Sequence, residues 1–384
     1  MITCISYVDE PPSLATASQR GIAVATILLA LLLAGCSRSE PVPAPSKNDR
    51  VEVVMPKDGA YLGAYVDFGF GEGNVTREAV TAFEQMTGKH LAVIAFGNFW
   101  GEQAFPAKTL EIVSAYGALP IIFWSPWDRP YEEDHGPDRF DLRDILAGKW
   151  DGYIDQWADA ARQYGKPLLV SWCLEMNGLW FPWAGYYYGA DKVVGQKDGR
   201  PLYAGPEYVK QVYRYVVDRV RARGADNILW GFHANHYGLP HKPWNDMANY
   251  YPGPDYVDWL GLSVYGQMLK SEEWSAFADV MDNAYAEICQ LDRDKPVIVA
   301  EWGVGEFPPH DKAAFISKAF ADMKTRYTRV RAAVYWHESW ENKDETISNL
   351  YVNSSPAALE AYQRAVADPF WIATPQYRAR PTRP

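Results

Sequence analysis

Short runs of apolar residues alternate with segments of helical periodicity along most of the chain, from about residue 52 onward. Near-continuous stretches of Val, Ile, Leu and Ala are typical of parallel strands that are buried on both faces of a sheet. Eight such runs are present, at residues 60–69, 90–100, 119–127, 166–175, 227–235, 257–266, 296–304 and 330–339.

The segments between these runs carry apolar residues at i, i+3, i+4 and i+7, which is the spacing of an amphipathic helix. The segment 76–88 also carries both boundary signals, because Thr76 is a suitable N-cap and Gly88 a suitable C-terminal residue. Further helices are predicted at residues 151–165, 206–224, 274–292, 312–327 and 356–367.

Eight strands that alternate with helices predict an α/β fold, a (β/α)8 TIM barrel that forms a single catalytic domain over residues 52–372. A doubly wound open sheet is the main alternative, but no GxGxxG or P-loop motif follows a predicted strand. Active sites of such barrels lie at the carboxyl ends of the strands. The residues that end each strand are therefore the candidates for chemistry.

The sequence predicts a signal peptide within the first 36 residues. An apolar run of signal-peptide length ends in Leu33-Ala34-Gly35-Cys36, which resembles the bacterial lipobox. We therefore expect export, lipidation of Cys36 and attachment to a bacterial membrane. An ordinary secretory signal or a short membrane anchor are the alternatives. Residues 1–19 lack signal-peptide character, which indicates an over-extended start.

A stretch rich in Pro and Ser follows at residues 37–51 and is predicted to be an extended tether. Residues 373–384 are predicted to be a C-terminal tail. Because Ser37 does not resemble an inner-membrane retention signal, the outer membrane is the expected site of attachment, facing either the periplasm or the outside.

Composition narrows the choice of ligands. The formal net charge of −11 argues against nucleic acid, because phosphate binding requires a basic face. The 16 tryptophans exceed what core packing normally needs.

Beyond Cys36 only Cys173 and Cys289 remain, in separate predicted elements, and both are expected to be free thiols. No CxxC motif or Cys/His cluster is present, so neither a metal nor another cofactor is expected.

Two predicted strands, the fourth and the seventh, end in carboxylates at Glu175 and Glu301. Glycoside cleavage requires such a pair, because one group protonates the leaving oxygen while the other attacks the anomeric carbon or activates water. A single glutamate at a strand end is more often a salt-bridge partner or a cap, and His233 with His236 offer a weak alternative of metal ligands. Aromatic and polar residues expected to bind substrate around the pair are Trp124, Asn177, Trp180, Trp183, Tyr186, His233, Asn235 and Trp336.

Three segments resemble glycoside hydrolase family 26, a family of retaining β-glycanases best known for β-mannanases. They are "LEMNGLWFPW" at 174–183, "YYPGPDYVDWLGLSVYG" at 250–266 and "VIVAEWG" at 297–303. The resemblance implies a barrel and a retaining mechanism. It further implies that Glu175 is the general acid/base, Glu301 the nucleophile and Tyr265 a hydrogen-bond donor to the nucleophile. It places Trp180 and Trp336 beside the sugars at the cleavage point.

Two positions depart from the family's usual pattern, because Leu174 replaces a common His and Ser263 replaces a common acid. The expected activity is therefore endo-acting hydrolysis of mannan, mixed-linkage glucan or a bacterial exopolysaccharide, with β-1,3-xylan also within the range of the family. A lipoprotein that binds, exports or attaches polysaccharide with little catalysis is the alternative. A transglycosylase would share the same covalent intermediate.

Overall fold

The computed structural model describes residues 51–69, 71–128, 139–342 and 344–379. Cys36, the signal segment and most of the predicted tether lie outside these residues, so the structure does not bear on them. Within the described residues, none of the helices combines the length and the apolar character needed to cross a membrane. Both Cys173 and Cys289 are free thiols, and Cys173 is buried.

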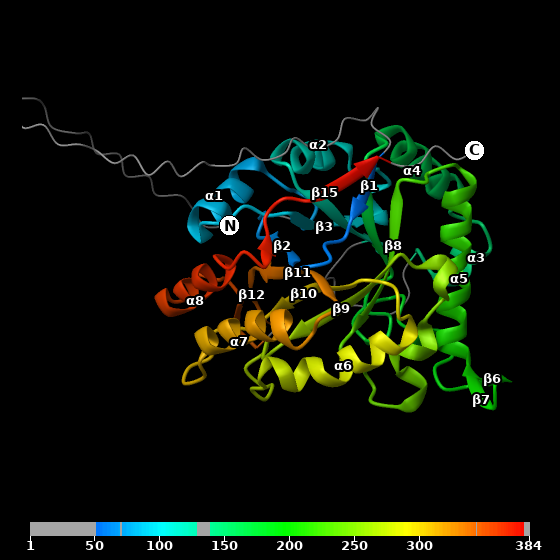
Figure 1. The fold of residues 1–384 in the computed structure, drawn as a ribbon. Coiled ribbons are helices and arrows are strands. Elements are labelled where there is room, and N and C mark those ends of the chain that lie inside the picture. Colours follow the sequence, from blue (N-terminus) through cyan, green and yellow to red (C-terminus); the bar gives the residue numbers. More distant parts are fainter. Residues whose placement is uncertain (1–50, 70, 129–138, 343, 380–384) are drawn as a thin grey trace, which may run out of the picture. The chain divides into compact units, whose positions relative to one another are not determined.

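Parallel strands close into a barrel, because the last strand, β11, pairs with the first, β2, from Ala332 opposite Tyr61 to His337 opposite Val66 (Figure 1). This closure confirms the predicted (β/α)8 barrel and excludes an open sheet. The barrel strands are β2 (Ala60–Val66), β3 (Val93–Phe99), β4 (Leu119–Ser125), β5 (Leu168–Trp172), β8 (Ile228–Asn235), β9 (Trp259–Tyr265), β10 (Val297–Gly303) and β11 (Val330–His337).

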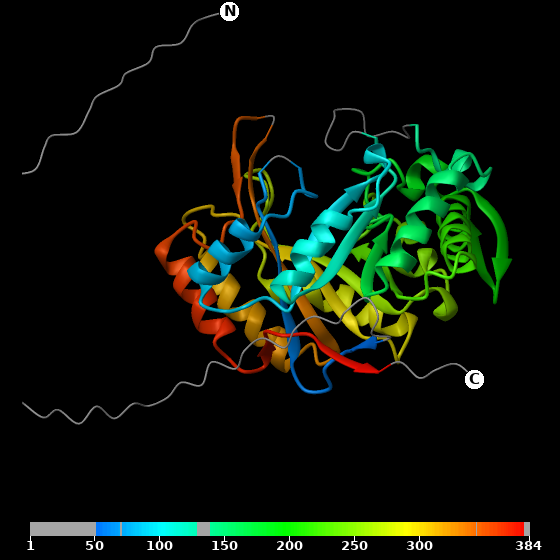
Figure 2. The same cartoon turned by 90° about the horizontal axis from the view of Figure 1, so that it is seen from above.

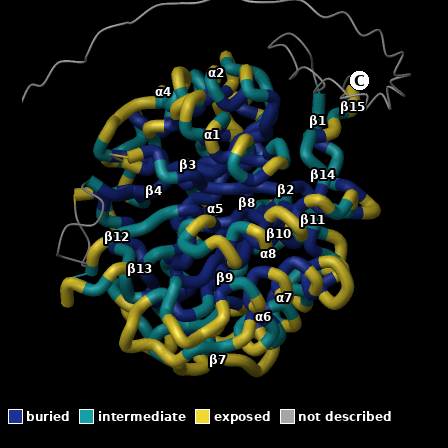
Figure 3. Tube along the Cα trace, turned by 90° about the vertical axis from the view of Figure 1, so that its left-hand side faces the viewer, coloured by how far each residue is buried: buried dark blue, intermediate teal, exposed yellow. Residues whose placement is uncertain are grey.

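Helices surround the barrel, and their outward turns carry the exposed residues while the strands stay buried (Figure 3). The Thr76 side chain accepts a hydrogen bond from the Ala79 amide, and Gly88 ends the helix with φ of 76°, as the sequence predicts. The helices are α1 (Arg77–Thr87), α2 (Ala107–Tyr116), α3 (Leu142–Leu146), α4 (Asp151–Tyr164), α5 (Ala204–Ala222), α6 (Phe277–Leu291), α7 (Lys312–Thr325) and α8 (Pro356–Val366).

One strand–helix unit departs from the regular pattern. The connection from β8 to β9 holds three short 3₁₀ helices, η3 (Pro243–Asn245), η4 (Met247–Tyr250) and η5 (Pro254–Tyr256), in place of an α-helix. Prolines recur along this segment, and each lacks the amide hydrogen that a helix interior requires. The chain therefore crosses between the two strands in short turns.

Short antiparallel pairs extend both ends of the barrel. The chain before β2 pairs with its C-terminal segment, Val51 opposite Ala379, at the amino ends of the strands. Figure 2 shows this pair and the β12–β13 hairpin at opposite ends of the barrel. The additional strands are β1 (Val51–Val54), β6 (Val193–Lys197), β7 (Arg200–Tyr203), β12 (Ser339–Glu341), β13 (Ile347–Asn349), β14 (Trp371–Ile372) and β15 (Gln376–Ala379).

Candidate active site

Glu175 follows the carboxyl end of β5 in a backbone conformation that residues with a side chain rarely adopt. Cys173 and Glu175 have φ angles of 53° and 51°, in the left-handed region. The Glu175 amide donates a hydrogen bond of 2.7 Å to the carbonyl of His233, which ties this turn to β8. Strained conformations of this kind are maintained by surrounding contacts and cluster at functional sites.

Glu301 lies within β10, opposite Ser263 of β9. The register between the two strands shifts between Val299 and Glu301, and irregularities of this type re-aim side chains. The Tyr265 hydroxyl, at the end of β9, donates a hydrogen bond of 2.9 Å to Oε2 of Glu301. Neighbouring strand ends therefore supply both a carboxylate and the donor that holds it.

The two carboxyl groups are equally buried and influence each other. Glu175 and Glu301 each expose only 6% of their surface to solvent. Burial raises the pKa of both groups, because the charged form loses its hydration. The negative charge of Glu175 raises the pKa of Glu301 further, and the Tyr265 hydrogen bond opposes this rise. Two carboxyls in this relation do not ionise together easily, so the pair holds one proton over a wide pH range.

Glu175 has two hydrogen-bond partners of different kinds. The Trp180 indole nitrogen donates to its Oε2 at 2.5 Å. The Ser263 hydroxyl also hydrogen-bonds to its carboxyl group, and both contacts oppose the rise in the Glu175 pKa caused by burial. Behind Ser263 lies His233, whose Nε2 is 2.8 Å from the serine Oγ. Burial lowers the pKa of His233 to about 3, so this imidazole is neutral.

An aromatic face adjoins the carboxyl pair. Trp336 lies near the end of β11 and stacks on Tyr65 of β2 with ring centroids 3.9 Å apart and an interplanar angle of 10°. Its indole nitrogen donates to Oε2 of Glu338 at 2.8 Å. The charge of Glu338 raises the pKa of Glu301. Glu338 and Trp336 therefore lie at the same end of the barrel as Glu301.

Asn177 and Asn235 connect the loops that follow β5 and β8. The Asn177 side chain donates to the Asn235 carbonyl at 3.0 Å and accepts from the Asn235 amide at 2.9 Å. The Asn235 side chain in turn donates to the Tyr237 carbonyl at 3.1 Å. Both amides therefore have protein partners and shape the rim. Tyr186 lies further out on η2 (Gly185–Tyr188), with 49% of its surface exposed.

Trp124 and Trp183, expected from the sequence to bind substrate, are instead packed inside the protein. Trp124 stacks on Trp157 of α4 at 4.1 Å and donates to the Tyr153 hydroxyl at 3.0 Å. Trp183 stacks on Phe181 at 4.6 Å and donates to the carbonyl of Leu174. Trp124 has no exposed surface and Trp183 retains 1%, so neither offers a face to a sugar. A sequence pattern does not distinguish an indole on the rim from one behind it.

Three residues of the site were not among the sequence candidates. Glu72, in the loop after β2, packs against Gly97 of β3, where an added Cβ would meet its Oε2 at 2.9 Å. Burial and the charge of Glu338 raise the pKa of Glu72 to about 8, and burial raises that of Glu338 to about 7. Ser171 on β5 contacts Nδ1 of His233 at 3.1 Å. The position of Glu338 near the end of a predicted strand, residues 330–339, was a usable signal, whereas Glu72 and Ser171 gave none.

The described residues contain no group of three or more His, Cys, Asp or Glu side chains that could hold a metal ion. The side chain of His233 lies between two serine hydroxyls, and Nδ1 of His236 faces the carbonyl of Ser263 at 3.2 Å. Both ring nitrogens of His233 thus face hydroxyls, and one ring nitrogen of His236 faces a carbonyl.

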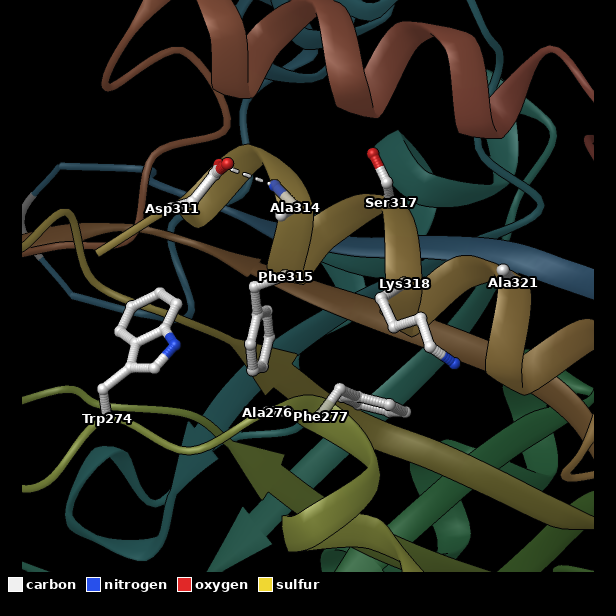
Figure 4. Close-up of a pocket in the computed structure, with 9 residues that line it drawn as sticks. All are labelled: Trp274, Ala276, Phe277, Asp311, Ala314, Phe315, Ser317, Lys318 and Ala321. Carbon is white, nitrogen blue, oxygen red and sulfur yellow. Dashed lines mark hydrogen bonds between the residues drawn. The ribbon is translucent and has the colours of Figure 1, made fainter. Parts of the chain in front are cut away.

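An apolar pocket of about 580 Å³ lies between α6 and α7, on the helical outside of the barrel (Figure 4). Asp311 sits at its edge and caps α7 by accepting a hydrogen bond of 2.8 Å from the Ala314 amide. None of its lining residues belongs to the carboxyl pair or its partners, so it is separate from the candidate active site. The lining residues are Trp274, Ala276, Phe277, Asp311, Ala314, Phe315, Ser317, Lys318 and Ala321.

A (β/α)8 barrel with a buried pair of carboxyl groups at the carboxyl ends of its strands defines a class, that of the barrel-fold glycoside hydrolases. The sequence model of glycosyl hydrolase family 26 matches residues 138–355, which is more than half of the chain. The protein therefore belongs to glycosyl hydrolase family 26, and the resemblance seen in the sequence is confirmed.

Two relatives place the chain within this family. Endoglucanase H of Acetivibrio thermocellus is 28% identical over 312 residues, which cover 80% of this chain and 30% of that protein. A mannan endo-1,4-beta-mannosidase of Bacillus subtilis is 30% identical over 263 residues, covering 67% of this chain and 63% of that protein. The chain thus spans less than two thirds of the length of either relative.

Solved structures agree on the fold. An endo-beta-1,4-mannanase double mutant from Cellulomonas fimi superposes with a TM-score of 0.57 at 19% identity, over 82% of this chain and 72% of that chain. A GH26 beta-mannanase from Bacteroides ovatus gives 0.56 at 17% identity, over 82% of this chain and 90% of that chain. At these identities the likeness establishes the barrel.

Proposed function

We propose that this protein is a retaining, endo-acting β-glycoside hydrolase that cleaves a β-linked polysaccharide. The observation that supports this function is the pair of equally buried carboxyl groups at the ends of β5 and β10, each with its own hydrogen-bond donors. Glu301 has the Tyr265 hydroxyl, which favours its ionised form. Glu175 has a partner, Ser263, that is able to donate or to accept.

We assign the two roles from the resemblance of residues 174–183 and 297–303 to the acid/base and nucleophile segments of the family. Ionised Glu301 attacks the anomeric carbon, and protonated Glu175 gives its proton to the glycosidic oxygen as the bond to the leaving sugar breaks. Glu175, now ionised, takes a proton from the water molecule that releases the sugar from Glu301. In retaining enzymes the two carboxyl groups lie about 5–5.5 Å apart. A close approach of this kind is consistent with the effect of the Glu175 charge, which raises the pKa of Glu301.

The substrate we propose is a β-linked polymer of neutral hexoses, a glucan or a mannan. The relatives include an endoglucanase and mannan endo-1,4-beta-mannosidases, which supports this substrate class. The Trp336 ring, stacked on Tyr65 beside the carboxyl pair, offers a flat face for a pyranose ring. Leu174 and Ser263 replace polar groups that are common in mannanases. Mixed-linkage glucan and bacterial exopolysaccharide should therefore be tested beside mannan.

The test is a reducing-end and product-size assay of the purified protein on mannan, mixed-linkage glucan, β-1,3-xylan and bacterial exopolysaccharides. We expect one polymer to yield oligosaccharides of several lengths from the earliest times, as internal cleavage requires, and to yield none with Glu175→Ala or Glu301→Ala. NMR of the first products should show the β anomer. Binding without cleavage, unaffected by loss of either glutamate, would identify a carbohydrate-binding lipoprotein instead.

We further propose that the chain is exported and lipid-anchored through Cys36, on the basis of the lipobox-like sequence that ends there. Metabolic labelling with a fatty acid followed by membrane fractionation tests this. Label in the wild-type chain and its loss in Cys36→Ser are expected. Release of an unlabelled wild-type chain into the soluble fraction would contradict the proposal.

A further inference from the structure

A line of three buried polar side chains extends from Glu175 into the barrel. Ser171 of β5, His233 of β8 and Ser263 of β9 have no exposed surface. The Ser171 Oγ is 3.1 Å from Nδ1 of His233, and the Ser263 Oγ is 2.8 Å from Nε2. Ser263 also hydrogen-bonds to the carboxyl group of Glu175. The active-site carboxyl therefore continues into a relay that contains no charged group.

The chemistry of this relay permits two hydrogen-bond directions. A neutral imidazole has one N–H and one bare nitrogen, and each serine hydroxyl has one hydrogen together with lone pairs. The imidazole stays neutral because burial lowers the pKa of His233 to about 3. Because both neighbours of the ring are hydroxyls, neither Nδ1 nor Nε2 is fixed as the protonated nitrogen.

The state of Glu175 selects one direction. When Glu175 is ionised it needs a donor, so the Ser263 hydroxyl points to it, Nε2–H of His233 donates to Ser263, and Ser171 donates to Nδ1. When Glu175 is protonated it donates to Ser263, so Ser263 donates to bare Nε2, and Nδ1–H donates to Ser171. The ring and the two serines hold the same number of hydrogens in both states, and the single proton of difference is the one bound by Glu175.

We infer that the tautomer of His233 is linked through Ser263 to the protonation of Glu175, so that Glu175 keeps a hydrogen-bonded partner both as an acid and as a base. His233 and Ser263 are then positioning residues for the proposed acid/base group, and the inference rests on the proposed function. Glu301 lacks such a relay in the described structure, because the partner of its Oε2 is the Tyr265 hydroxyl.

Other titratable groups close to Glu175 set where the switch occurs. Glu301 on β10, Tyr265 on β9 and Tyr237 after β8 each feel the charge of Glu175. Burial raises the pKa of both tyrosines, so they remain neutral around neutral pH. The charge of Glu175 raises the pKa of Glu301, and because such an interaction is mutual, removal of Glu301 should make Glu175 easier to ionise.

The chain contains a matched control in His337, which is also buried and has a pKa that burial lowers to about 3. Its Nδ1 accepts a hydrogen bond of 3.0 Å from the Val352 amide. Because an amide can only donate, Nδ1 must stay bare and the proton must stay on Nε2. His337 should therefore keep one tautomer over the whole pH range in which the protein is folded.

The experiment is a pH titration of the full chain labelled with ¹⁵N-histidine, followed by ¹⁵N–¹H NMR, with ¹³C-glutamate labelling to report Glu175. We expect His233 to change from the Nδ1–H to the Nε2–H form as pH rises, with the same midpoint as Glu175, while His337 stays Nε2–H. Glu301→Gln should lower both midpoints together. A His233 that keeps one tautomer while Glu175 titrates would overturn the inference.

Ser263→Ala and Ser263→Thr provide the functional readout. The alanine variant should uncouple His233 from Glu175 and move the basic limb of the kcat/KM profile to higher pH by roughly one unit, because ionised Glu175 loses a donor. Threonine retains the hydroxyl and should restore both properties. Equal profiles for alanine and wild type would count against the relay. If no polymer is cleaved, the proposed function fails while the wild-type NMR titration still decides the linkage.

Discussion

Glu175 and Glu301 have the same exposed fraction and opposite kinds of surroundings. Glu301 projects from within β10, and Oε2 of its carboxyl accepts from the Tyr265 hydroxyl. Glu175 lies beyond the end of β5, on a turn with left-handed backbone, between the Trp180 indole and the Ser263 hydroxyl. One carboxyl group thus lies within a barrel strand, beside a shift in register, and the other lies on a turn with left-handed backbone.

This difference matches what the two steps of a double displacement require. A nucleophile needs to be ionised and held in one place, and the Tyr265 hydroxyl on the neighbouring strand donates to ionised Glu301. An acid/base group needs to exist in two protonation states, and a hydroxyl partner accommodates either one. Burial alone, which raises the pKa of both groups, would not separate the roles. The hydrogen-bond partners differ beyond the first contact, because the Ser263 hydroxyl is in turn 2.8 Å from Nε2 of His233.

The largest expected effect comes from Glu301→Gln, which removes the proposed nucleophile while it preserves the shape of the side chain. We expect hydrolysis to fall by more than about 10⁴-fold, because the amide cannot form the covalent intermediate that the carboxylate forms. The loss should be the same for polymers and for activated aryl glycosides. Initial rates on both substrates measure this, and thermal unfolding checks that the fold is retained. Residual activity within about tenfold of wild type would exclude Glu301 as the nucleophile.

Glu175→Ala should have the next largest effect, and one that depends on the leaving group. Loss of a general acid costs about 10²–10⁴-fold where a sugar must depart. An aryl glycoside with an acidic phenol needs little protonation, so formation of its glycosyl-enzyme should be nearly unaffected, and a burst of phenol should precede slow hydrolysis. Stopped-flow detection of the burst measures this. If Glu175→Ala lost the same fraction of its rate on the polymer and on the aryl glycoside, as predicted for Glu301→Gln, Glu175 would not be distinguished from Glu301 as the general acid.

Tyr265→Phe addresses the partner of Glu301. Without the hydroxyl the ionised form of Glu301 loses a charged hydrogen bond worth about 1.5–3 kcal/mol, which corresponds to about 10–100-fold in kcat/KM. The pKa of Glu301 should rise, so the acidic limb of the kcat/KM profile should move to higher pH while the basic limb stays in place. The full pH profile measures both limbs. A shift confined to the basic limb would assign Tyr265 to Glu175 instead.

The fold was largely predictable from the sequence because burial on both faces leaves a direct mark on it. All positions of β2, β3, β4, β9 and β10 are buried, and such strands require near-continuous apolar runs. The connection from β8 to β9 was not predictable in detail, since its prolines exclude a long helix without specifying the turns that replace it. Helix α2 was not predicted from the sequence.

The candidate site was predictable only in part, because rim residues and packing residues look alike in a sequence. Glu175 and Glu301 were found because strand ends carry catalytic groups in this fold. Trp124 occupies the same kind of position, yet its ring turns outward and stacks on Trp157 of α4. The direction in which a strand-end side chain points depends on barrel register, which no single strand reveals. Ser171 in turn acquires its role only from contact with His233, 62 positions away.

Trp180 shows the same limit and leads to the smallest effect we predict. The resemblance implies that Trp180 flanks the bound sugars. Its indole also donates a hydrogen bond of 2.5 Å to Glu175, whereas Tyr265 donates to Glu301. In Trp180→Phe the ionised form of Glu175 loses this donor but retains Ser263, so kcat/KM should fall by only about tenfold. The pKa of Glu175 should rise. Since Glu175 must be protonated at the first step, the basic limb of the kcat/KM profile should move to higher pH.

The matched comparison is therefore between two loss-of-donor variants, Trp180→Phe and Tyr265→Phe, measured over the same pH range on the same polymer. Each removes one donor from one carboxyl group, and each should displace one limb of the profile to higher pH, the basic limb for Trp180 and the acidic limb for Tyr265. If Trp180→Phe displaced the acidic limb instead, the assignment of acid/base and nucleophile would have to be exchanged.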